Sequence, residues 1–119
     1  MNRTFIEVPL FIKQWKEIGF SDNELFQLQN LLLDQPDRGA MIEGTGGIRK
    51  MRFALPGRGK RSSVRICYVD FPEFGSVYLI TVYRKSEKET LTDEEKQILR
   101  QLVKDLKAEA RKNYRRPLT

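Results

Sequence analysis

The chain contains no histidine among its 119 residues, and this absence excludes several kinds of site. Histidine-based nucleophilic triads, zinc sites built from histidine and cysteine, and ribonuclease chemistry with two histidines all need the missing imidazole. Acid–base catalysis must therefore use lysine, arginine, tyrosine or carboxylate side chains. Asp34, Asp37 and Glu43 fit turn and capping roles better than a metal site, so neither a metal ion nor another cofactor is expected.

The chain also has little cysteine and no long apolar run. Its single cysteine, Cys67, excludes an internal disulfide, and an apolar setting predicts that the thiol is buried. No segment approaches the length of a membrane span, and the first ten residues lack the hydrophobic region of a secretory signal. We therefore expect a cytoplasmic protein with no membrane partner, folded as one domain over residues 1–119.

Acidic residues are absent from positions 44–69, and this window carries the excess positive charge of the chain. It holds seven of the 22 basic residues, which leaves 15 basic residues elsewhere against 16 acidic ones. The seven are Arg49, Lys50, Arg52, Arg58, Lys60, Arg61 and Arg65. Positive charge gathered in one place is typical of a polyanion-binding site. The alternative is a solvated sheet face, but like charges crowded without carboxylates disfavour a purely structural role.

Hydrophobic periodicity and turn residues predict a small α+β fold. The predicted strands cover residues 4–8, 48–55, 64–71 and 76–83. Helices are predicted from Pro9 to Gly19, from Ser21 to about Leu33 and from near Thr92. Ser21 and Thr92 each stand three residues before a glutamate, which is the spacing of a capping box. We therefore expect a mainly antiparallel sheet of about four strands with helices on one face.

Apolar residues at helical spacing give each predicted helix a side that faces the core. Phe11 and Trp15 mark this side in the first helix, Phe26 belongs to it in the second, and Ile98 in the last. The basic residues between positions 96 and 111 are expected on the solvated side of the last helix.

The alternation of side chains along strands predicts where the charges meet. Side chains two residues apart share a face, so Lys50 and Arg52 point the same way from one strand. On the next strand Arg65 shares a face with Cys67.

The same rule on the strand over 76–83 predicts that Tyr83 shares a face with Leu79 and Thr81, and Lys85 continues that alternation. The residues expected to meet on one sheet face or at its rim are Lys50, Arg52, Arg65, Tyr83 and Lys85. The basic loop with Lys60 and Arg61 is expected above them.

Three ordered blocks of the sequence resemble one family. They are GTGGIRKMR at 44–52, GRGKRSSVRICY at 57–68 and VYLITVYRKSEKETLT at 77–92. Together they resemble the RelE/ParE superfamily of toxin–antitoxin toxins, most of all the HigB branch of RelE-type mRNA interferases, over roughly residues 4–110. The resemblance implies a small twisted antiparallel sheet with two N-terminal helices on one face and a C-terminal helix.

The resemblance also implies an activity, which is ribosome-dependent cleavage of mRNA without a metal ion. In this family the ribose 2′-hydroxyl attacks the scissile phosphate and leaves a cyclic phosphate and a free 5′-hydroxyl. Arg65 would stabilise the transition state, while Tyr83 would stack on a base or transfer a proton, with Lys85 beside it. The general base stays open between Lys50 and Tyr83. Backbone phosphates would be held by Arg49, Lys50 and Arg52, and substrate or ribosomal RNA by Lys60 and Arg61. The other residues expected to bind RNA are Arg58 and Lys85.

Besides the mRNA endonuclease, a second and a third hypothesis fit the same residues. A basic sheet also suits a ParE-like toxin that acts on gyrase, or a non-catalytic module that binds RNA or the ribosome, because phosphate affinity needs only charge. A degenerate toxin whose basic surface only docks an acidic antitoxin is the third. The toxin readings imply a cognate antitoxin, a small helix-turn-helix protein of the HigA type, with mRNA and the ribosome as the other partners.

Overall fold

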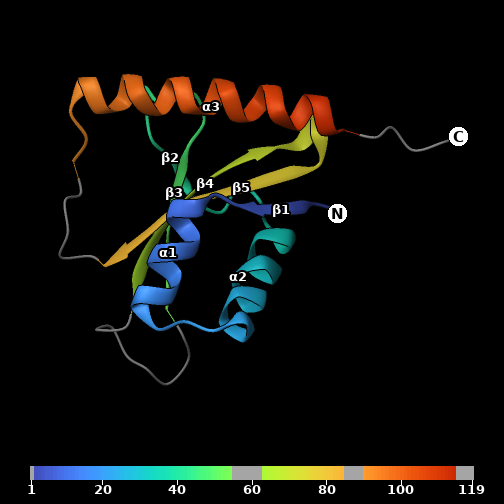
Figure 1. The fold of residues 1–119 in the computed structure, drawn as a ribbon, viewed down its shortest axis with the longest axis vertical. Coiled ribbons are helices and arrows are strands. Elements are labelled where there is room, and N and C mark those ends of the chain that lie inside the picture. The colour runs from blue at the N-terminus through green and yellow to red at the C-terminus, as the bar shows by residue number, and fades with distance from the viewer. Residues whose placement is uncertain (1, 55–62, 85–89, 115–119) are drawn as a thin grey trace, which may run out of the picture.

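The computed structural model describes residues 2–54, 63–84 and 90–114, and its fold is of the predicted α+β class (Figure 1). The helices are α1 (Pro9–Ile18), α2 (Asp22–Asp34) and α3 (Asp93–Asn113). The strands are β1 (Thr4–Glu7), β2 (Ala40–Met41), β3 (Arg49–Phe53), β4 (Val64–Phe71) and β5 (Ser76–Arg84). A single turn of 3₁₀ helix, Pro72–Phe74, joins β4 to β5.

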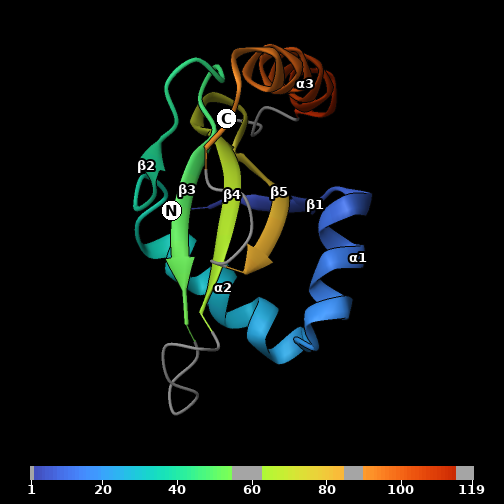
Figure 2. The same ribbon diagram turned by 90° about the vertical axis from the view of Figure 1, so that its left-hand side faces the viewer.

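The described strands form one sheet in the order β1-β5-β4-β3-β2 (Figure 2). β1 runs parallel to β5, and the other neighbours are antiparallel. The sheet therefore has one strand more than the sequence predicts. The additional strand, β2, has only two residues, which is too short for an alternating pattern to reveal.

Local sequence signals set the helix starts as predicted. α1 begins at Pro9, where the missing proline N–H costs no hydrogen bond. At the start of α2 the backbone N–H of Ser21 donates to the Glu24 carboxylate at 3.0 Å. At the start of α3 the N–H of Thr92 donates to Glu95 at 2.9 Å, and the N–H of Glu95 donates to the Thr92 hydroxyl at 3.1 Å. Both predicted capping boxes are confirmed.

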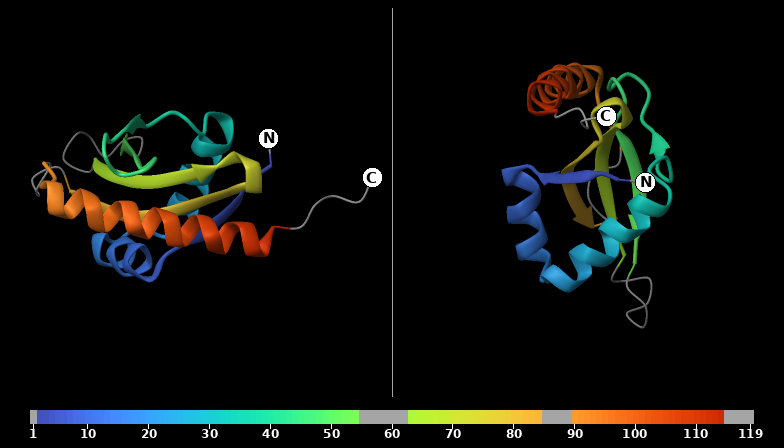
Figure 3. Two further views of the ribbon diagram at one scale, coloured as in Figure 1. Left: turned by 90° about the horizontal axis from the view of Figure 1, so that it is seen from above. Right: turned by 90° about the vertical axis from the view of Figure 1, so that its right-hand side faces the viewer.

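The helices pack on both sides of the sheet, each side with its own core. α1 and α2 lie on one side and α3 on the other (Figures 1 and 3). Phe11, Trp15 and Leu28 pack against the α1/α2 side of the sheet, and Val103 and Ala110 pack against the α3 side. The two N-terminal helices share one face, as the resemblance implied, but α3 covers the other face, so the expectation that helices lie only opposite the basic residues is wrong. None of the helices in the described part of the chain has the length and apolarity needed to cross a bilayer.

The predicted helix faces need correction at several positions. Phe26 is 61 % exposed and Ile98 is 69 % exposed, so neither belongs to the core. The basic side of α3 is not simply solvated, because the Arg100 guanidinium donates to the Gly44 carbonyl at 3.0 Å. Lys107 lies 3.6 Å from a Glu73 carboxylate oxygen. Helical spacing alone does not show which neighbouring segments a helix touches.

The GTGG run forms the turn that leads into β3. Its glycines, Gly44, Gly46 and Gly47, have φ angles of 85°, 82° and 126°. Residues other than glycine rarely adopt such positive φ angles. Thr45 is fully buried. Its hydroxyl donates to the Ile42 carbonyl at 2.7 Å and accepts from the Ile48 N–H at 3.2 Å. The turn therefore fixes Ile42 and Ile48 beside α3.

Tyr68 joins the sheet to the loop between α2 and β2. It is fully buried, and its hydroxyl accepts from the Gly39 N–H at 2.9 Å and donates to the Pro36 carbonyl at 2.8 Å. A Cβ atom on Gly39 would lie 3.0 Å from both the Lys50 carbonyl oxygen and the Tyr68 ring. The loop is therefore held close against β3 and β4.

Replacement of Tyr68 by phenylalanine is expected to lower the free energy of unfolding by about 1–3 kcal/mol, because two buried backbone groups lose their partner. Urea denaturation followed by circular dichroism measures the change. Tyr114→Phe is the matched control, since Tyr114 is exposed and its replacement should change stability by less than about 0.5 kcal/mol. Equal effects of the two substitutions would contradict the role given to the buried hydroxyl.

Candidate functional site

Two arginines and a tyrosine lie in register across three strands. Arg52 on β3 is opposite Arg65 on β4, and Arg65 is opposite Tyr83 on β5. Residues directly opposite each other share a face, with Cβ atoms about 4.5–5.5 Å apart. We call Arg52, Arg65 and Tyr83 the cation row. Arg52 is exposed and the other two are half-buried, so the row can be reached from solvent.

The neighbouring row places a third cation beside the first two. Lys50 is opposite Cys67, and Cys67 is opposite Thr81. Cys67 belongs to the core beneath α3, so both rows lie on the α3 side of the sheet. The structure thus brings four predicted site residues onto one face: Lys50, Arg52, Arg65 and Tyr83.

The position of Tyr83 depends on a bulge in β5 that the sequence does not reveal. Tyr68 is opposite Leu79, whereas the preceding residue, Cys67, is opposite Thr81. Ile80 therefore has no partner on β4, and this extra residue reverses the alternation of β5 beyond it. Leu79 packs in the α1/α2 core, while Tyr83 packs against the α3 side. The prediction that Tyr83 shares a face with Leu79 is wrong for this reason.

Gln14 of α1 holds the bulged segment of β5. β1 pairs with β5 only as far as Leu79, so beyond that residue none of the described strands lies along the outer edge of β5. The side-chain oxygen of Gln14 accepts from the Val82 N–H at 3.0 Å and from the Thr81 hydroxyl at 2.8 Å. Gln14 therefore binds the backbone immediately before Tyr83 and fixes its direction.

Arg65 carries an unsatisfied donor at the centre of the cation row. Among the side chains that the structure describes, its Nη1 atom is buried and has no hydrogen-bond partner. Native structures leave few buried polar atoms in this state, and such atoms call for an explanation. The described part of the chain therefore leaves the Arg65 guanidinium one hydrogen bond short.

The Cys67 thiol lies next to the cation row, close to both Lys50 and Tyr83. Burial raises the pKa of the Cys67 thiol to about 11, while the charge of Lys50 and a hydrogen bond with Tyr83 act in the opposite direction. Cys67 is 7 % exposed, which confirms the prediction of a buried thiol. The raised pKa and the burial disfavour the thiolate, which is the reactive form of cysteine.

Two arginines near the row point elsewhere. Arg49 is opposite Tyr68 and thus lies on the α1/α2 side. Its guanidinium donates to the Gly39 carbonyl at 2.8 Å and to the Asp37 carbonyl at 3.4 Å. Arg84 is opposite the buried Val64 of the α1/α2 core and is exposed. Four predicted RNA-binding residues lie outside the described residues: Arg58, Lys60, Arg61 and Lys85.

Sequence reasoning missed the residues that support the cations rather than the cations themselves. Gln14 is one glutamine among the polar residues of an amphipathic helix, and no sequence signal marks it. The Ile80 bulge contains no glycine that would suggest an irregular strand. Within the described part of the chain, cysteine, aspartate and glutamate form no group of three that could hold a metal ion.

The fold is similar to that of a known toxin. No family model matches the chain. Among solved structures, the chain is similar to the E. coli toxin RelE, a mutant with two arginines replaced by alanine, in the free state. The sequences are 19 % identical, the TM-score is 0.51, and the match covers 72 % of this chain and 86 % of that chain. The chain therefore has a RelE-like fold, as the resemblance implied.

Replacement of Gln14 by alanine is expected to loosen the bulge, because the Val82 N–H and the Thr81 hydroxyl lose their acceptor. The free energy of unfolding should fall by about 1–2 kcal/mol, and the Val82 amide should exchange with solvent faster. Amide exchange followed by NMR measures the local effect. Lys13→Ala, at an exposed position of the same helix, should leave the Val82 amide unchanged; equal exchange in the two variants would contradict the role of Gln14.

Proposed function

We propose that this chain is the toxin of a type II toxin–antitoxin system and an endoribonuclease that cleaves mRNA on the ribosome. The observation that carries the proposal is the cation row, with Lys50 beside it, on a RelE-like fold. Rigid strands hold these side chains in register. A flexible basic tail would bind RNA without placing several donors around one phosphate.

The proposed reaction is attack of a ribose 2′-hydroxyl on the adjacent phosphate. A bond forms between the 2′-oxygen and phosphorus, and the bond from phosphorus to the 5′-oxygen breaks. The products are a 2′,3′-cyclic phosphate and a free 5′-hydroxyl. Lys50 in its free amine form, or Tyr83 in its phenolate form, takes the proton of the 2′-hydroxyl, and water supplies a proton to the leaving 5′-oxygen. The chemistry requires no metal ion, in keeping with the expectation from composition.

Arg65 has the central part in this proposal, since negative charge on the phosphate oxygens grows in the transition state. A donor fixed before the reaction stabilises that charge without reorganisation. The Nη1 atom of Arg65 has no acceptor among the described residues, so a phosphate oxygen that displaces the atoms covering it gains a charge-assisted hydrogen bond there. Arg52, directly opposite on β3, adds a second cation to the same phosphate.

The partners follow from the same proposal. A cognate antitoxin of the HigA type neutralises the toxin, either with an acidic segment laid over the cation row or by blocking entry to the ribosome. The site of action is the translating ribosome in the cytoplasm. Assignment to the HigB branch is part of the proposal and rests on the three sequence blocks.

Replacement of Arg65 by alanine is expected to lower the cleavage rate at least about 100- to 1000-fold, which is the usual effect of removing one donor to a developing oxyanion. Primer extension on translated mRNA after induction measures it, together with growth. Arg84→Ala is the matched control, because it removes the same charge from a nearby exposed position on the other side of the sheet. The Arg84→Ala variant should cut mRNA and arrest growth to the same extent as the unsubstituted chain.

Three outcomes would overturn parts of the proposal. A folded Arg65→Ala variant with full cleavage would refute the role of Arg65. Intact transcripts with stalled replication would favour a gyrase-directed toxin, and expression of the unsubstituted chain without growth inhibition would favour a degenerate toxin or a binding module. Circular dichroism of both variants separates loss of chemistry from loss of fold.

A further inference from the structure

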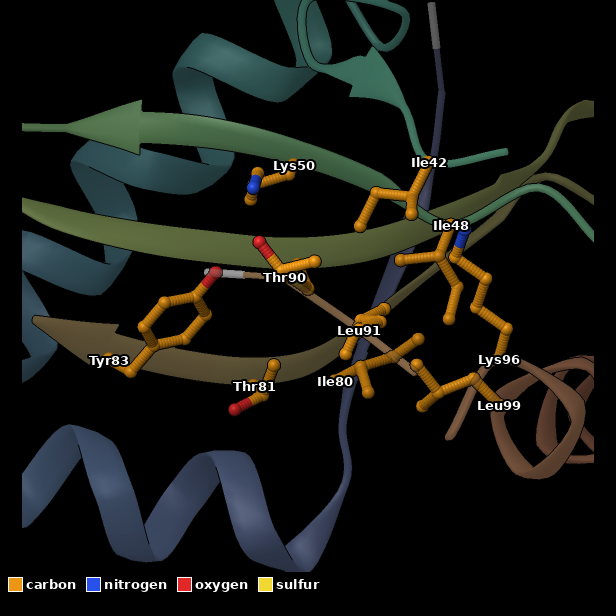
Figure 4. A pocket seen from close by; sticks show the side chains of 11 residues that line it. Ile42, Ile48, Lys50, Ile80, Thr81, Tyr83, Thr90, Leu91, Lys96 and Leu99 are labelled. Carbon is orange, nitrogen blue, oxygen red and sulfur yellow. The ribbon is translucent and has the colours of Figure 1, made fainter. Parts of the chain in front are cut away.

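A cavity of about 310 Å³ opens beside the cation row, on the α3 side of the sheet (Figure 4). It lies among β3, β4 and β5, the turn before β3, and the segment that leads into α3. Its lining includes Lys50, Cys67 and Tyr83, which also converge at the proposed catalytic face. The cavity and that face are therefore continuous.

The cavity has an apolar end and a polar end. Figure 4 shows the Lys50 amine and the Tyr83 ring at one end, with Thr90 between them and the apolar group. The aliphatic side chains at the other end are Ile42, Ile48, Ile80, Leu91 and Leu99. Lys96 of α3 lies beside this apolar end. Among the described lining residues none carries a carboxylate and two carry amines, Lys50 and Lys96, so this part of the lining suits an anionic ligand.

The β5 bulge shapes this cavity as well as the cation row. Ile80 and Thr81 are consecutive residues, yet both line the cavity, which regular alternation along a strand does not allow. The Thr81 hydroxyl already donates to Gln14. The Thr90 hydroxyl and the Lys96 amine are therefore the groups suited to the polar edge of a ligand.

We propose that the cavity holds one base of the RNA, from the nucleotide whose phosphate contacts Lys50, so that the enzyme reads a base beside the linkage that it cuts. This inference rests on the proposed function. A nucleobase has apolar faces and a polar edge, which match the aliphatic walls and the groups of Thr90 and Lys96. Splayed-out RNA bases commonly stack on aromatic rings, and Tyr83 stands where the cavity meets the cation row.

Size and charge favour a base over a protein segment. Ligand cavities range from about 300 to 1000 Å³, so a volume of about 310 Å³ suits one planar ring system and not the face of a partner helix. Lys50 belongs both to the cavity and to the sheet face that faces the proposed phosphate. One nucleotide can therefore contact both parts, whereas a peptide would have to supply separate acidic and apolar groups.

The direct test is a titration of the methyl-labelled chain with AMP, GMP, CMP and UMP, followed by NMR. The methyl signals of Ile80 and Leu99 should shift with the nucleotides, and at least one nucleotide should bind about tenfold more tightly than ribose 5-phosphate, which is within the usual effect of one base-stacking contact. Ribose 5-phosphate has no base and should leave these methyl signals in place. Equal shifts with ribose 5-phosphate, or none with any nucleotide, would overturn the proposal.

A variant that fills the cavity gives a second test. Leu91→Trp should weaken nucleotide binding about tenfold and leave binding of ribose 5-phosphate unchanged. Ile98→Trp is the control, because Ile98 is 69 % exposed and does not line the cavity; it should change neither. Nucleotide binding that survives in a folded Leu91→Trp variant would overturn the proposal. The titration of the unsubstituted chain decides the matter if Leu91→Trp does not fold.

Failure of this inference can be distinguished from failure of the proposed function. If the chain cuts translated mRNA but the methyl signals of the cavity do not shift with nucleotides, the base-pocket proposal is refuted and the endonuclease proposal stands. If nucleotides bind by their bases but mRNA stays intact, the pocket stands and the endonuclease proposal fails. Methyl shifts with a short acidic, leucine-containing peptide, and none with nucleotides, would identify a protein-docking cavity and overturn the base pocket.

Discussion

The register of β5 against β4 is the constraint on which the proposed site depends. Val77 and Leu79 of β5 face α1 and α2, and regular alternation would place Tyr83 on the same side. The unpaired Ile80 reverses the alternation. Tyr83 then joins Arg52 and Arg65 on the other face, and Ile80 and Thr81 both reach the cavity. Gln14 stabilises this arrangement from α1. One extra residue thus assembles the row and shapes the space beside it.

The arrangement of charges is better explained by binding than by stability. Arg52 and Arg65 stand directly opposite each other, and like charges in such a pair destabilise a sheet. β4 does carry one carboxylate, Asp70, but it lies near the far end of the strand. There it accepts a hydrogen bond from Arg3 at 2.8 Å in a mostly buried ion pair. No carboxylate of the described residues is paired with the cation row, and under the proposed function an anionic ligand supplies the counter-charge.

Much of the fold can be predicted from the sequence because its signals are local. Pro9 and the two capping boxes set helix starts, glycines set the turn before β3, and β-branched residues mark the longer strands. Along β3 and the first part of β4, alternation also predicts correctly that Lys50, Arg52 and Arg65 share a face. The prediction fails where tertiary contacts decide the structure: β2 has two residues, Arg49 turns to backbone carbonyls, and the bulge at Ile80 depends on a glutamine more than 60 residues away.

The most direct test of this account is the side of the sheet on which the Tyr83 ring lies, which nuclear Overhauser contacts report. The account predicts contacts from the Tyr83 ring to the side chains of Arg65 and Cys67, on the α3 side. Contacts from that ring to Leu28 or Trp15, in the core beneath α1 and α2, would mean that β5 has no bulge. The cation row would then lose its tyrosine, and both the proposed chemistry and the base pocket would lose their basis.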